Sequence, residues 1–253
     1  MEETYWFVFD RKGRLLLTEE GTLPASPLNP VPMVDSPTIL HLPSLEGKSC
    51  QAVCAEELPP VPSYQLVPLR ASFDILPMAH YQMAGKAYEL LHWDACTKYC
   101  GVCGAPMAFH SDISRQCTHC GKVVWPQLAT AIIVAVTRGT DEILLVQSKN
   151  LQGDYLGLVA GFVETGETLE ECVRREVLEE TNLEIKDLTY FRSQPWPYPR
   201  GLMVGFKARY ASGELKLQRS ELNKGGWYRR DNLPPIPGKV SLARQLIDDW
   251  LSQ

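Results

Sequence analysis

Residues 160–183 read AGFVETGETLEECVRREVLEETNL and decide the architecture of the C-terminal half of the chain. Thr168 followed by Glu171 has the spacing of a capping box, so a helix is predicted to begin there. At about 100° per residue, one face of this helix carries an apolar stripe. The stripe consists of Leu169, Cys172, Val173 and Val177. We therefore predict a helix over 168–181 that packs this stripe on a core.

Two glutamates lie in the same stripe. Glu176 and Glu180 are four residues apart and face the core together, while Glu179 lies at the edge of the stripe. A solvated, charged helix surface is one interpretation of such a run. The other is a bound cation, because unpaired buried carboxylates cost more free energy than the helix could recover. Hard oxygen ligands suit Mg²⁺ or Mn²⁺, so the sequence favours metal-assisted attack on a phosphate or pyrophosphate.

Four of the eight cysteines form two CxxC pairs. Cys100 and Cys103 are followed by Cys117 and Cys120, with thirteen residues between the two pairs. Two such turns bring four thiolates into a tetrahedron that suits structural Zn²⁺ and leaves no open coordination position. A redox-active CxxC is the weaker alternative, because it would leave one pair unexplained. We therefore predict a zinc ribbon with one Zn²⁺ per chain.

The segment SQPWPYPRG, residues 193–201, alternates prolines with aromatic residues. Proline fixes φ and cannot donate to a sheet ladder, so this segment is predicted to be a stiff loop or an edge strand. Trp196 and Tyr198 would point the same way in an extended backbone and could form a platform for a flat ligand. A lid over the local core is the alternative.

Composition narrows the class of protein. The chain has 253 residues and a net charge of −5, which argues against gripping duplex nucleic acid by bulk charge. Its apolar runs are shorter than a membrane span, and its start lacks the basic region of a signal peptide, so a cytoplasmic protein without a membrane partner is expected. No internal repeat is visible.

Apolar patterning predicts the remaining elements. The first ninety-odd residues have short apolar runs broken by proline-rich stretches at 24–37 and 58–62, which is typical of a β-rich domain with long loops. A helix is expected over about 79–93, a hairpin from 131–136 and 142–148, a strand near 202–210, and a last helix from Ser241.

The segment quoted first resembles the Nudix box, the signature of the Nudix hydrolase superfamily. Gly161, Glu167, Arg175, Glu176, Val177, Glu179, Glu180 and Leu183 match its pattern, and Asn182 replaces its final glycine. Asparagine also tolerates a left-handed helix end. The resemblance implies an α+β Nudix fold, with a mixed sheet between helices. We expect a β-rich N-terminal domain over 1–95, a zinc ribbon over 96–125 and a Nudix domain over 126–253.

SQPWPYPRG resembles the SQPWPFPxS motif of NudC-type NADH pyrophosphatases, with Tyr198 in place of phenylalanine and Gly201 in place of the final serine. A four-cysteine ribbon ahead of a Nudix domain is similar to the same family. The resemblance implies a homodimer that splits NAD(H) into AMP and nicotinamide mononucleotide and removes NAD caps from RNA 5′ ends. It implies an aromatic clamp of Trp196 and Phe162 on nicotinamide. The substrate-binding set it implies is Arg70, Asp112, Trp125, Phe162, Gln194, Pro195, Trp196, Pro197, Tyr198, Pro199, Arg200, Gly201 and Ala243.

The resemblance also implies a catalytic set. Glu176, Glu180, the Ala160 carbonyl and Glu221 would hold Mg²⁺ or Mn²⁺, with Glu179 as a secondary ligand. Glu221 is chosen because the family places a metal carboxylate six residues before a tryptophan, here Trp227; Glu214 and Asp231 are the alternatives. The general base is a box glutamate or Glu221, and Arg175 has a positioning role.

Two other functions are compatible with the sequence. A broader pyrophosphatase would use the same metal site on ADP-ribose, diadenosine compounds or FAD. A zinc-ribbon protein that binds RNA through a vestigial Nudix fold would have no hydrolytic activity, although every carboxylate of the box is present.

Overall fold

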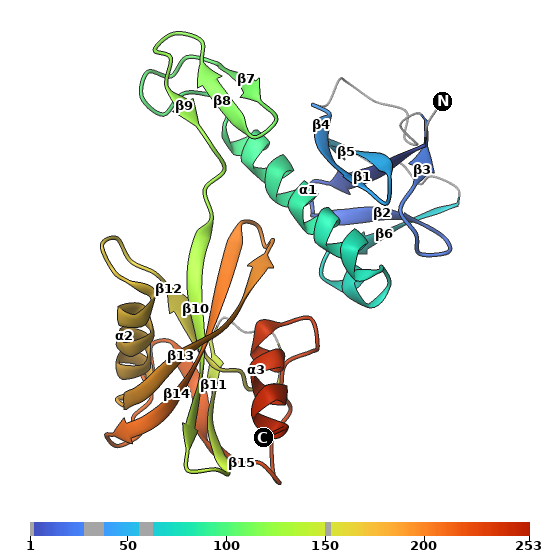
Figure 1. Ribbon diagram of the computed structural model, residues 1–253. Coiled ribbons are helices and arrows are strands. Elements are labelled where there is room, and N and C mark those ends of the chain that lie inside the picture. The colour runs from blue at the N-terminus through green and yellow to red at the C-terminus, as the bar shows by residue number, and fades with distance from the viewer. Residues whose placement is uncertain (1–2, 28–37, 56–62, 150–152) are drawn as a thin grey trace. The chain divides into compact units, whose positions relative to one another are not determined.

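The computed structural model describes residues 3–27, 38–55, 63–149 and 153–253. Its contacts divide the chain into two compact units (Figure 1). The first unit contains the residues up to Leu128 together with Pro197–Arg200, and the second contains Ala129–Trp196 and Gly201–Gln253. The predicted three-domain division stays a prediction.

The first unit is built on a six-stranded sheet with the order β4-β5-β1-β2-β6, in which β3 also pairs with β1. The strands are β1 (Thr4–Asp10), β2 (Arg14–Thr18), β3 (Ala25–Ser26), β4 (Leu40–Leu45), β5 (Lys48–Ala55) and β6 (Tyr64–Pro68). A 3-10 turn, η1 (Ala71–Asp74), leads to helix α1 (Met78–Cys96), which contacts β4, β5 and β1. The β-rich N-terminal region is therefore confirmed. The predicted loop at 58–62 and most of that at 24–37 lie outside the described residues.

Alternation along β1 gives the first unit a core on each face of its sheet. Trp6 and Val8 pack with Leu16 and Val53 on one face. Phe9 points the other way, where its ring lies 5.2 Å from that of Tyr88 on α1.

A small three-stranded sheet follows α1, with the order β7 (Met107–Ser111), β8 (Ser114–Cys117) and β9 (Val123–Val124). It is tied to α1 by a buried ion pair between Arg115 and Asp94, which also accepts a hydrogen bond from Lys98 at 2.6 Å. Arg115 further donates to the Met107 carbonyl at 2.9 Å. A buried charge pair with its hydrogen bonds made holds both elements in one arrangement.

The second unit has a mixed sheet with the order β13-β14-β10-β11-β15, in which β12 also pairs with β10. Strands β10 and β14 are parallel, and the other neighbours are antiparallel. The strands are β10 (Ala129–Arg138), β11 (Glu142–Ser148), β12 (Val159–Phe162), β13 (Glu184–Trp196), β14 (Gly201–Ser212) and β15 (Leu222–Arg229). Helix α2 (Leu169–Thr181) packs on one face and α3 (Leu242–Leu251) on the other (Figure 1). The predicted mixed sheet between helices is confirmed.

Although no repeat is visible in the sequence, the two six-stranded sheets have the same topology. In each, a central strand pairs in parallel with one neighbour, β1 with β5 and β10 with β14, and carries a short antiparallel strand, β3 or β12. The two sheets therefore share one topology, although the two halves of the sequence show no visible repeat. The segment between β3 and β4 contains no glutamate, so the first sheet has no counterpart of the acidic box.

Most predicted elements are found within a few residues. The expected helix over 79–93 extends to Cys96, the hairpin and the strand near 202–210 form, and both capped helices begin after Thr168 and Ser241. Within the described residues, no helix has the length and apolar character needed to cross a membrane.

The proline-rich segment differs from one expectation. Ser193–Trp196 lies in β13, an edge strand as predicted, but the extended backbone stops at Trp196 and residues 197–200 form a turn. The proposed platform of Trp196 and Tyr198 is therefore wrong, because it needed both residues in one extended run. The Tyr198 hydroxyl instead lies 2.6 Å from that of Tyr81 on α1.

Candidate active site

Helix α2 begins and ends as its sequence requires. The Thr168 hydroxyl accepts a hydrogen bond from the Glu171 N–H at 3.2 Å, and the Glu171 carboxylate accepts one from the Thr168 N–H at 2.8 Å. At the other end, Asn182 is left-handed with φ of 58°. These caps fix which residues face the sheet, because they fix where the helix begins and ends.

The two inward glutamates are buried as predicted. Glu176 is 9% exposed and Glu180 6%, whereas Leu178, on the opposite side, is 51% exposed. Of the apolar stripe, Cys172, Val173 and Val177 are fully buried, and Leu169 is partly buried against the same core. The interpretation of this run as a solvated surface is therefore wrong for Glu176 and Glu180.

Gly161 creates the space that Glu176 occupies. Gly161 lies on β12, opposite Ile132 of β10. A Cβ atom on Gly161 would overlap the Glu176 carboxylate. The glycine at this position of the box is thus needed because side chain and strand backbone meet there, and not because of an unusual φ.

Arg175 joins the loop before α2 to the carboxylates on it. Its guanidinium donates to both carboxylate oxygens of Glu167, at 2.7 and 2.9 Å. It also donates to Glu176 at 2.8 Å, to Glu179 at 3.1 Å and to the Phe162 carbonyl at 3.1 Å. The Glu167 carboxyl, so paired, has its pKa lowered to about 2. Sequence analysis assigned Arg175 a positioning role but did not single out Glu167, although it is part of the matched pattern.

Burial and mutual repulsion make the inward carboxylates reluctant to ionise. Desolvation, followed by the charges of Glu176, Glu221 and Glu179, raises the pKa of Glu180 to about 8. The pKa of Glu176 is also raised by burial, although Arg175 opposes this. Of the three acidic residues considered after the box, Glu221 is the one whose charge raises both pKa values.

The donor set fits a divalent cation. Buried, mutually repelling carboxylates are relieved by a hard cation, and all the donors are oxygen. Glu221 adds an exposed carboxylate directly before β15, and Ala160 lies on β12 beside Gly161. Among the described residues, however, only the cysteines bring three or more ligand atoms within 4.8 Å of one another, so these carboxylates form a looser group.

The four cysteines of the ribbon converge. The Cys100 and Cys120 sulfurs are 3.6 Å apart, those of Cys103 and Cys117 are 3.5 Å apart, and all four lie within 4.8 Å of one another. Backbone N–H groups of Cys120 and His119 point at the Cys117 sulfur and lower the pKa of its thiol to about 6. Such a cluster of thiolates could hold tetrahedral zinc.

The predicted substrate-binding residues are divided between the two units. Arg70, Asp112, Trp125, Pro197, Tyr198, Pro199 and Arg200 belong to the first, and Phe162, Gln194, Pro195, Trp196, Gly201 and Ala243 to the second. Phe162 is 66% exposed and Trp125 53%, so both rings are available to a ligand. Ala243 is buried on α3, and the Gln194 amide donates to the Val240 carbonyl at 2.7 Å.

Two residues of α1 that hold the 197–200 turn were not predicted from the sequence. Tyr81 contacts the Tyr198 hydroxyl, and a Cβ on Gly85 would lie only 2.9 Å from Pro197. Gly85 carried a signal, because a glycine inside a helix often marks a close approach of another segment.

Comparison with known proteins agrees with this site. Residues 126–250 match the NUDIX domain family, and residues 3–93 match the NADH pyrophosphatase-like rudimentary NUDIX domain family. Residues 126–250 therefore form a NUDIX domain, and residues 3–93 are similar to a rudimentary domain of the same kind.

Two curated relatives are named NAD-capped RNA hydrolase NudC. The protein from Yersinia enterocolitica serotype O:8 / biotype 1B is 48% identical over 67% of this chain and 65% of its own length. The one from Yersinia pestis (strain Pestoides F) is 47% identical over the same shares. The chain thus spans just under two thirds of these relatives. A NUDIX hydrolase structure from Nitrosomonas europaea, with 18% identity and a TM-score of 0.53, covers 61% of this chain and 90% of its own, which supports the fold alone.

Proposed function

We propose that this chain hydrolyses the pyrophosphate bond of NAD(H), giving AMP and nicotinamide mononucleotide, and removes NAD caps from RNA 5′ ends. The observation that carries the proposal is the pair of buried carboxylates on α2, held beside Arg175, in a chain whose relatives are named for that activity. Carboxylates of this kind would hold the divalent cation through which a diphosphate binds.

The metal assignments are part of the proposal. Glu176, Glu180, Glu221 and the Ala160 carbonyl would hold Mg²⁺ or Mn²⁺, and the four cysteines would hold one structural Zn²⁺. When bound, the divalent ion neutralises the diphosphate and lowers the pKa of a water molecule.

The protein's own groups set the geometry of the reaction. Arg175 fixes Glu176 and Glu179 relative to the box loop through Glu167, and Gly161 lets Glu176 approach β12. In hydrolysis, a water oxygen forms a bond to one phosphorus, and the bond between that phosphorus and the bridging oxygen breaks. A box glutamate or Glu221 accepts the proton of that water.

Substrate selection would depend on aromatic rings. Exposed Phe162 and partly exposed Trp196 are the proposed clamp on nicotinamide, and the remaining predicted substrate-binding residues are proposed to surround it. We further infer that the protein is a homodimer, because the NudC-type resemblance implies one. We infer that it is cytoplasmic, because the paired CxxC motifs suit a reducing compartment.

Glu180→Gln tests the proposed reaction. The amide keeps the shape of the side chain but removes a metal ligand, so kcat for NADH should fall by about two to three orders of magnitude with KM little changed. Glu170→Gln, which removes an exposed charge from the same helix, is the matched control and should retain activity. Near-wild-type turnover of Glu180→Gln with Mn²⁺ would refute the metal assignment.

Product analysis tests the substrate. Mass spectrometry after reaction in ¹⁸O water should find AMP and nicotinamide mononucleotide from NADH, with the label on one of them, and a 5′-monophosphate RNA from an NAD-capped oligonucleotide. Faster cleavage of ADP-ribose than of NADH at equal concentration would favour the broader pyrophosphatase and discard the nicotinamide clamp.

A further inference from the structure

The segment that carries Glu221 lies against the C-terminal end of α2. Residues 213–221 connect β14 to β15 and form neither helix nor strand (Figure 1). Most of their side chains are exposed. Glu221 nevertheless lies close enough to the box that, beyond the effect of burial, its charge helps to raise the pKa of Glu176 and Glu180. Individual contacts, rather than a regular element, must therefore hold this segment in place.

Two backbone hydrogen bonds attach the segment to the last turn of α2. The Gln218 N–H donates to the Glu180 carbonyl at 2.8 Å, and the Lys216 N–H donates to the Thr181 carbonyl at 2.9 Å. Carbonyl groups in the last turn of a helix lack a partner within the helix, so they can accept these bonds. Glu180, whose carboxylate is a proposed metal ligand, therefore also holds the segment through its backbone.

A third hydrogen bond continues this series and comes from a side chain. The Asn182 amide donates to the Glu214 carbonyl at 3.0 Å. Three consecutive residues at the end of α2, 180–182, are thus bonded to residues 218, 216 and 214 of the segment. A glycine, which the Nudix pattern has at position 182, could not donate the third bond. The departure from the pattern therefore adds an attachment.

Gly213 allows the segment to begin close to the helix end. A Cβ atom on Gly213 would lie 2.5 Å from the Asn182 carbonyl oxygen and 3.2 Å from the Leu183 Cα atom. Both are backbone atoms, which cannot move aside as the end of a side chain can. The φ of Gly213 is 102°, a value that favours glycine. The segment therefore needs glycine here for two separate reasons.

The attachment reaches Glu221 through one tight turn. The Gln218 carbonyl accepts hydrogen bonds from the Glu221 N–H at 3.1 Å and from the Leu222 N–H at 2.9 Å. On its other side, the Glu221 carbonyl accepts a hydrogen bond at 2.7 Å from the N–H of Lys149, directly after β11. A shift of the segment at Gln218 would therefore move the Glu221 carboxylate relative to the carboxylates on α2.

We propose that Asn182 and Gly213 are positioning residues for Glu221, and that they set the affinity of the site for its divalent cation. They act by holding the segment on the end of α2, so that Glu221 meets the cation together with the carboxylates of the box. Mutation of groups that orient metal ligands typically lowers metal affinity by about 10- to 100-fold. The inference rests on the proposed function, in which Glu221 is a metal ligand.

Binding of Mn²⁺ to the full chain without substrate, followed by the EPR signal of free Mn²⁺, tests the proposal. Asn182→Gly keeps a residue suited to a left-handed helix end but removes the amide donor. It should weaken Mn²⁺ binding about three- to tenfold, the effect of one hydrogen bond. Gly213→Ala should weaken it by about tenfold or more, because strain and overlap both displace the segment.

Gly139→Ala is the matched control. Gly139 has a φ of 62° in the turn between β10 and β11, and a Cβ atom there meets open space, so this variant has backbone strain without overlap. Its Mn²⁺ affinity should equal that of wild type. Melting temperatures report whether each variant is folded. If Gly213→Ala does not fold, Asn182→Gly decides the outcome, since glycine is tolerated at a helix end.

A double-mutant cycle with Glu221 separates positioning from a general loss of structure. Glu221→Gln should itself weaken Mn²⁺ binding. In that background Asn182→Gly and Gly213→Ala should cause little further loss, because they act through the Glu221 carboxylate. Kinetics should show the same division. In Asn182→Gly the Mn²⁺ concentration for half-maximal hydrolysis of NADH should rise, while kcat at saturating Mn²⁺ stays within about twofold of wild type.

Hydrogen exchange of the metal-free chain gives a readout that does not depend on activity. In Asn182→Gly the backbone amides of Lys216 and Gln218 should exchange faster than in wild type, because the segment they belong to has lost an attachment. Amides in the middle of α2 should exchange at the wild-type rate. Faster exchange throughout α2 would show a general loss of structure and would contradict a positioning role.

The binding results distinguish failure of this inference from failure of the proposed function. Wild-type Mn²⁺ affinity in either folded variant, or losses that add fully to that of Glu221→Gln, would overturn the positioning role. If Glu221→Gln binds Mn²⁺ weakly while Asn182→Gly binds it as wild type does, the proposed function stands and only this inference is rejected. If Glu221→Gln binds Mn²⁺ as tightly as wild type, the proposed metal ligand and this inference are both rejected.

Discussion

Gly161 illustrates how one residue can act through the space it leaves. A Cβ atom there would overlap the Glu176 carboxylate, and an exposed or displaced Glu176 could no longer face the same point as Glu180. Gly161→Ala should therefore lower kcat for NADH by about 10- to 100-fold, the size of effect expected when a catalytic group moves by about 1 Å. Steady-state kinetics with Mg²⁺ check this. Gly238→Ala, where a Cβ meets open space, is the control; equal activity of both variants would contradict the argument.

Glu89 should make stability depend on pH. Its folded-state pKa of about 7 lies above the ordinary value of 4.5, so this group's unfavourable effect is absent below about pH 4.5 and grows as the pH rises to about 7. Glu89→Gln removes this effect and should be more stable than wild type at pH 8 by about 1 to 2 kcal/mol, a discounted figure because the side chain is half-buried.

The comparison of two pH values isolates Glu89. The stability of Glu89→Gln relative to wild type is measured by urea unfolding at pH 5 and at pH 8, and the change in this difference between the two pH values reports the effect of Glu89. Glu19→Gln, an exposed change, should be as stable as wild type at both pH values. A Glu89→Gln effect that is the same at pH 5 and pH 8 would show that burial of the charge is not its cause.

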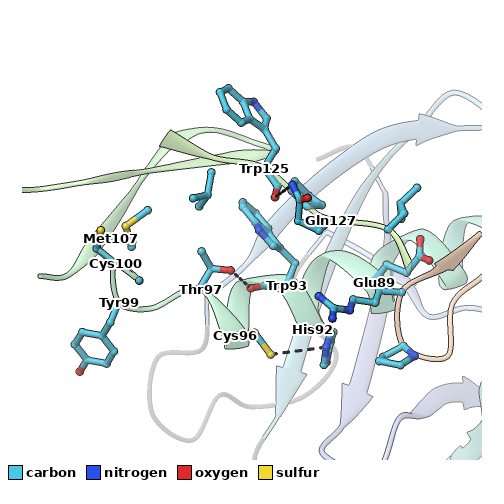
Figure 2. A pocket seen from close by; sticks show the side chains of 16 residues that line it. Glu89, His92, Trp93, Cys96, Thr97, Tyr99, Cys100, Met107, Trp125 and Gln127 are labelled. Atoms are coloured by element: carbon cyan, nitrogen blue, oxygen red, sulfur yellow. Dashed lines mark hydrogen bonds between the residues drawn. The ribbon is translucent and has the colours of Figure 1, made fainter. Parts of the chain in front are cut away.

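At the scale of elements, helix α1 holds the turn that follows Trp196. Tyr81, Gly85 and Glu89 are spaced four residues apart on one face; the first two meet Tyr198 and Pro197, and the third lines a cavity of about 660 Å³ that Arg200 also lines (Figure 2). Tyr198, which α1 holds in this way, is itself one of the predicted substrate-binding residues.

The Tyr81–Tyr198 contact can be measured by a double-mutant cycle. Tyr81→Phe and Tyr198→Phe each leave one buried hydroxyl without this partner and should each lower the free energy of unfolding by about 1 kcal/mol, whereas the double variant should lose less than the sum. Each single variant should also raise KM for NADH severalfold. Tyr190→Phe, whose ring is 61% exposed, is the control. Additive single effects would exclude a direct coupling.

At the scale of the whole molecule, the sequence predicted the elements that depend on a short motif or on a periodic apolar pattern. The capping box, the helical stripe and the CxxC spacing fix α2 and the ribbon, because each is written within about twenty residues. The strand pattern likewise located β10, β11 and β14. The resemblance supplied Glu221, whose closeness to Glu180 depends on β15, far along the chain.

Contacts between distant segments were not predictable in the same way. The turn at 197–200 replaces an extended run because Pro197 and Tyr198 pack on α1, more than a hundred residues earlier. The burial of the Glu89 carboxylate likewise depends on segments that pack on α1 from elsewhere in the chain, and the amphipathic pattern of the helix alone does not predict it. The duplicated sheet topology is invisible for the same reason, since different residues can satisfy one strand order.

Two compact units predict two responses to loss of metal. Cys100, Cys117 and Met107 are the buried residues of the ribbon's core, so the ribbon has little else to fold around once the thiolates repel one another. A strong chelator should therefore lower the melting temperature of one calorimetric transition, that of the first unit, and leave the other, that of the second unit, within about two degrees. Cys117→Ser should do the same without chelator, whereas Cys96→Ser, an exposed cysteine outside the quartet, should not. A single calorimetric transition that shifts as a whole on addition of chelator would contradict a structural metal confined to the first unit. A purified protein that contains no zinc, and whose melting temperature the chelator does not change, would also contradict it.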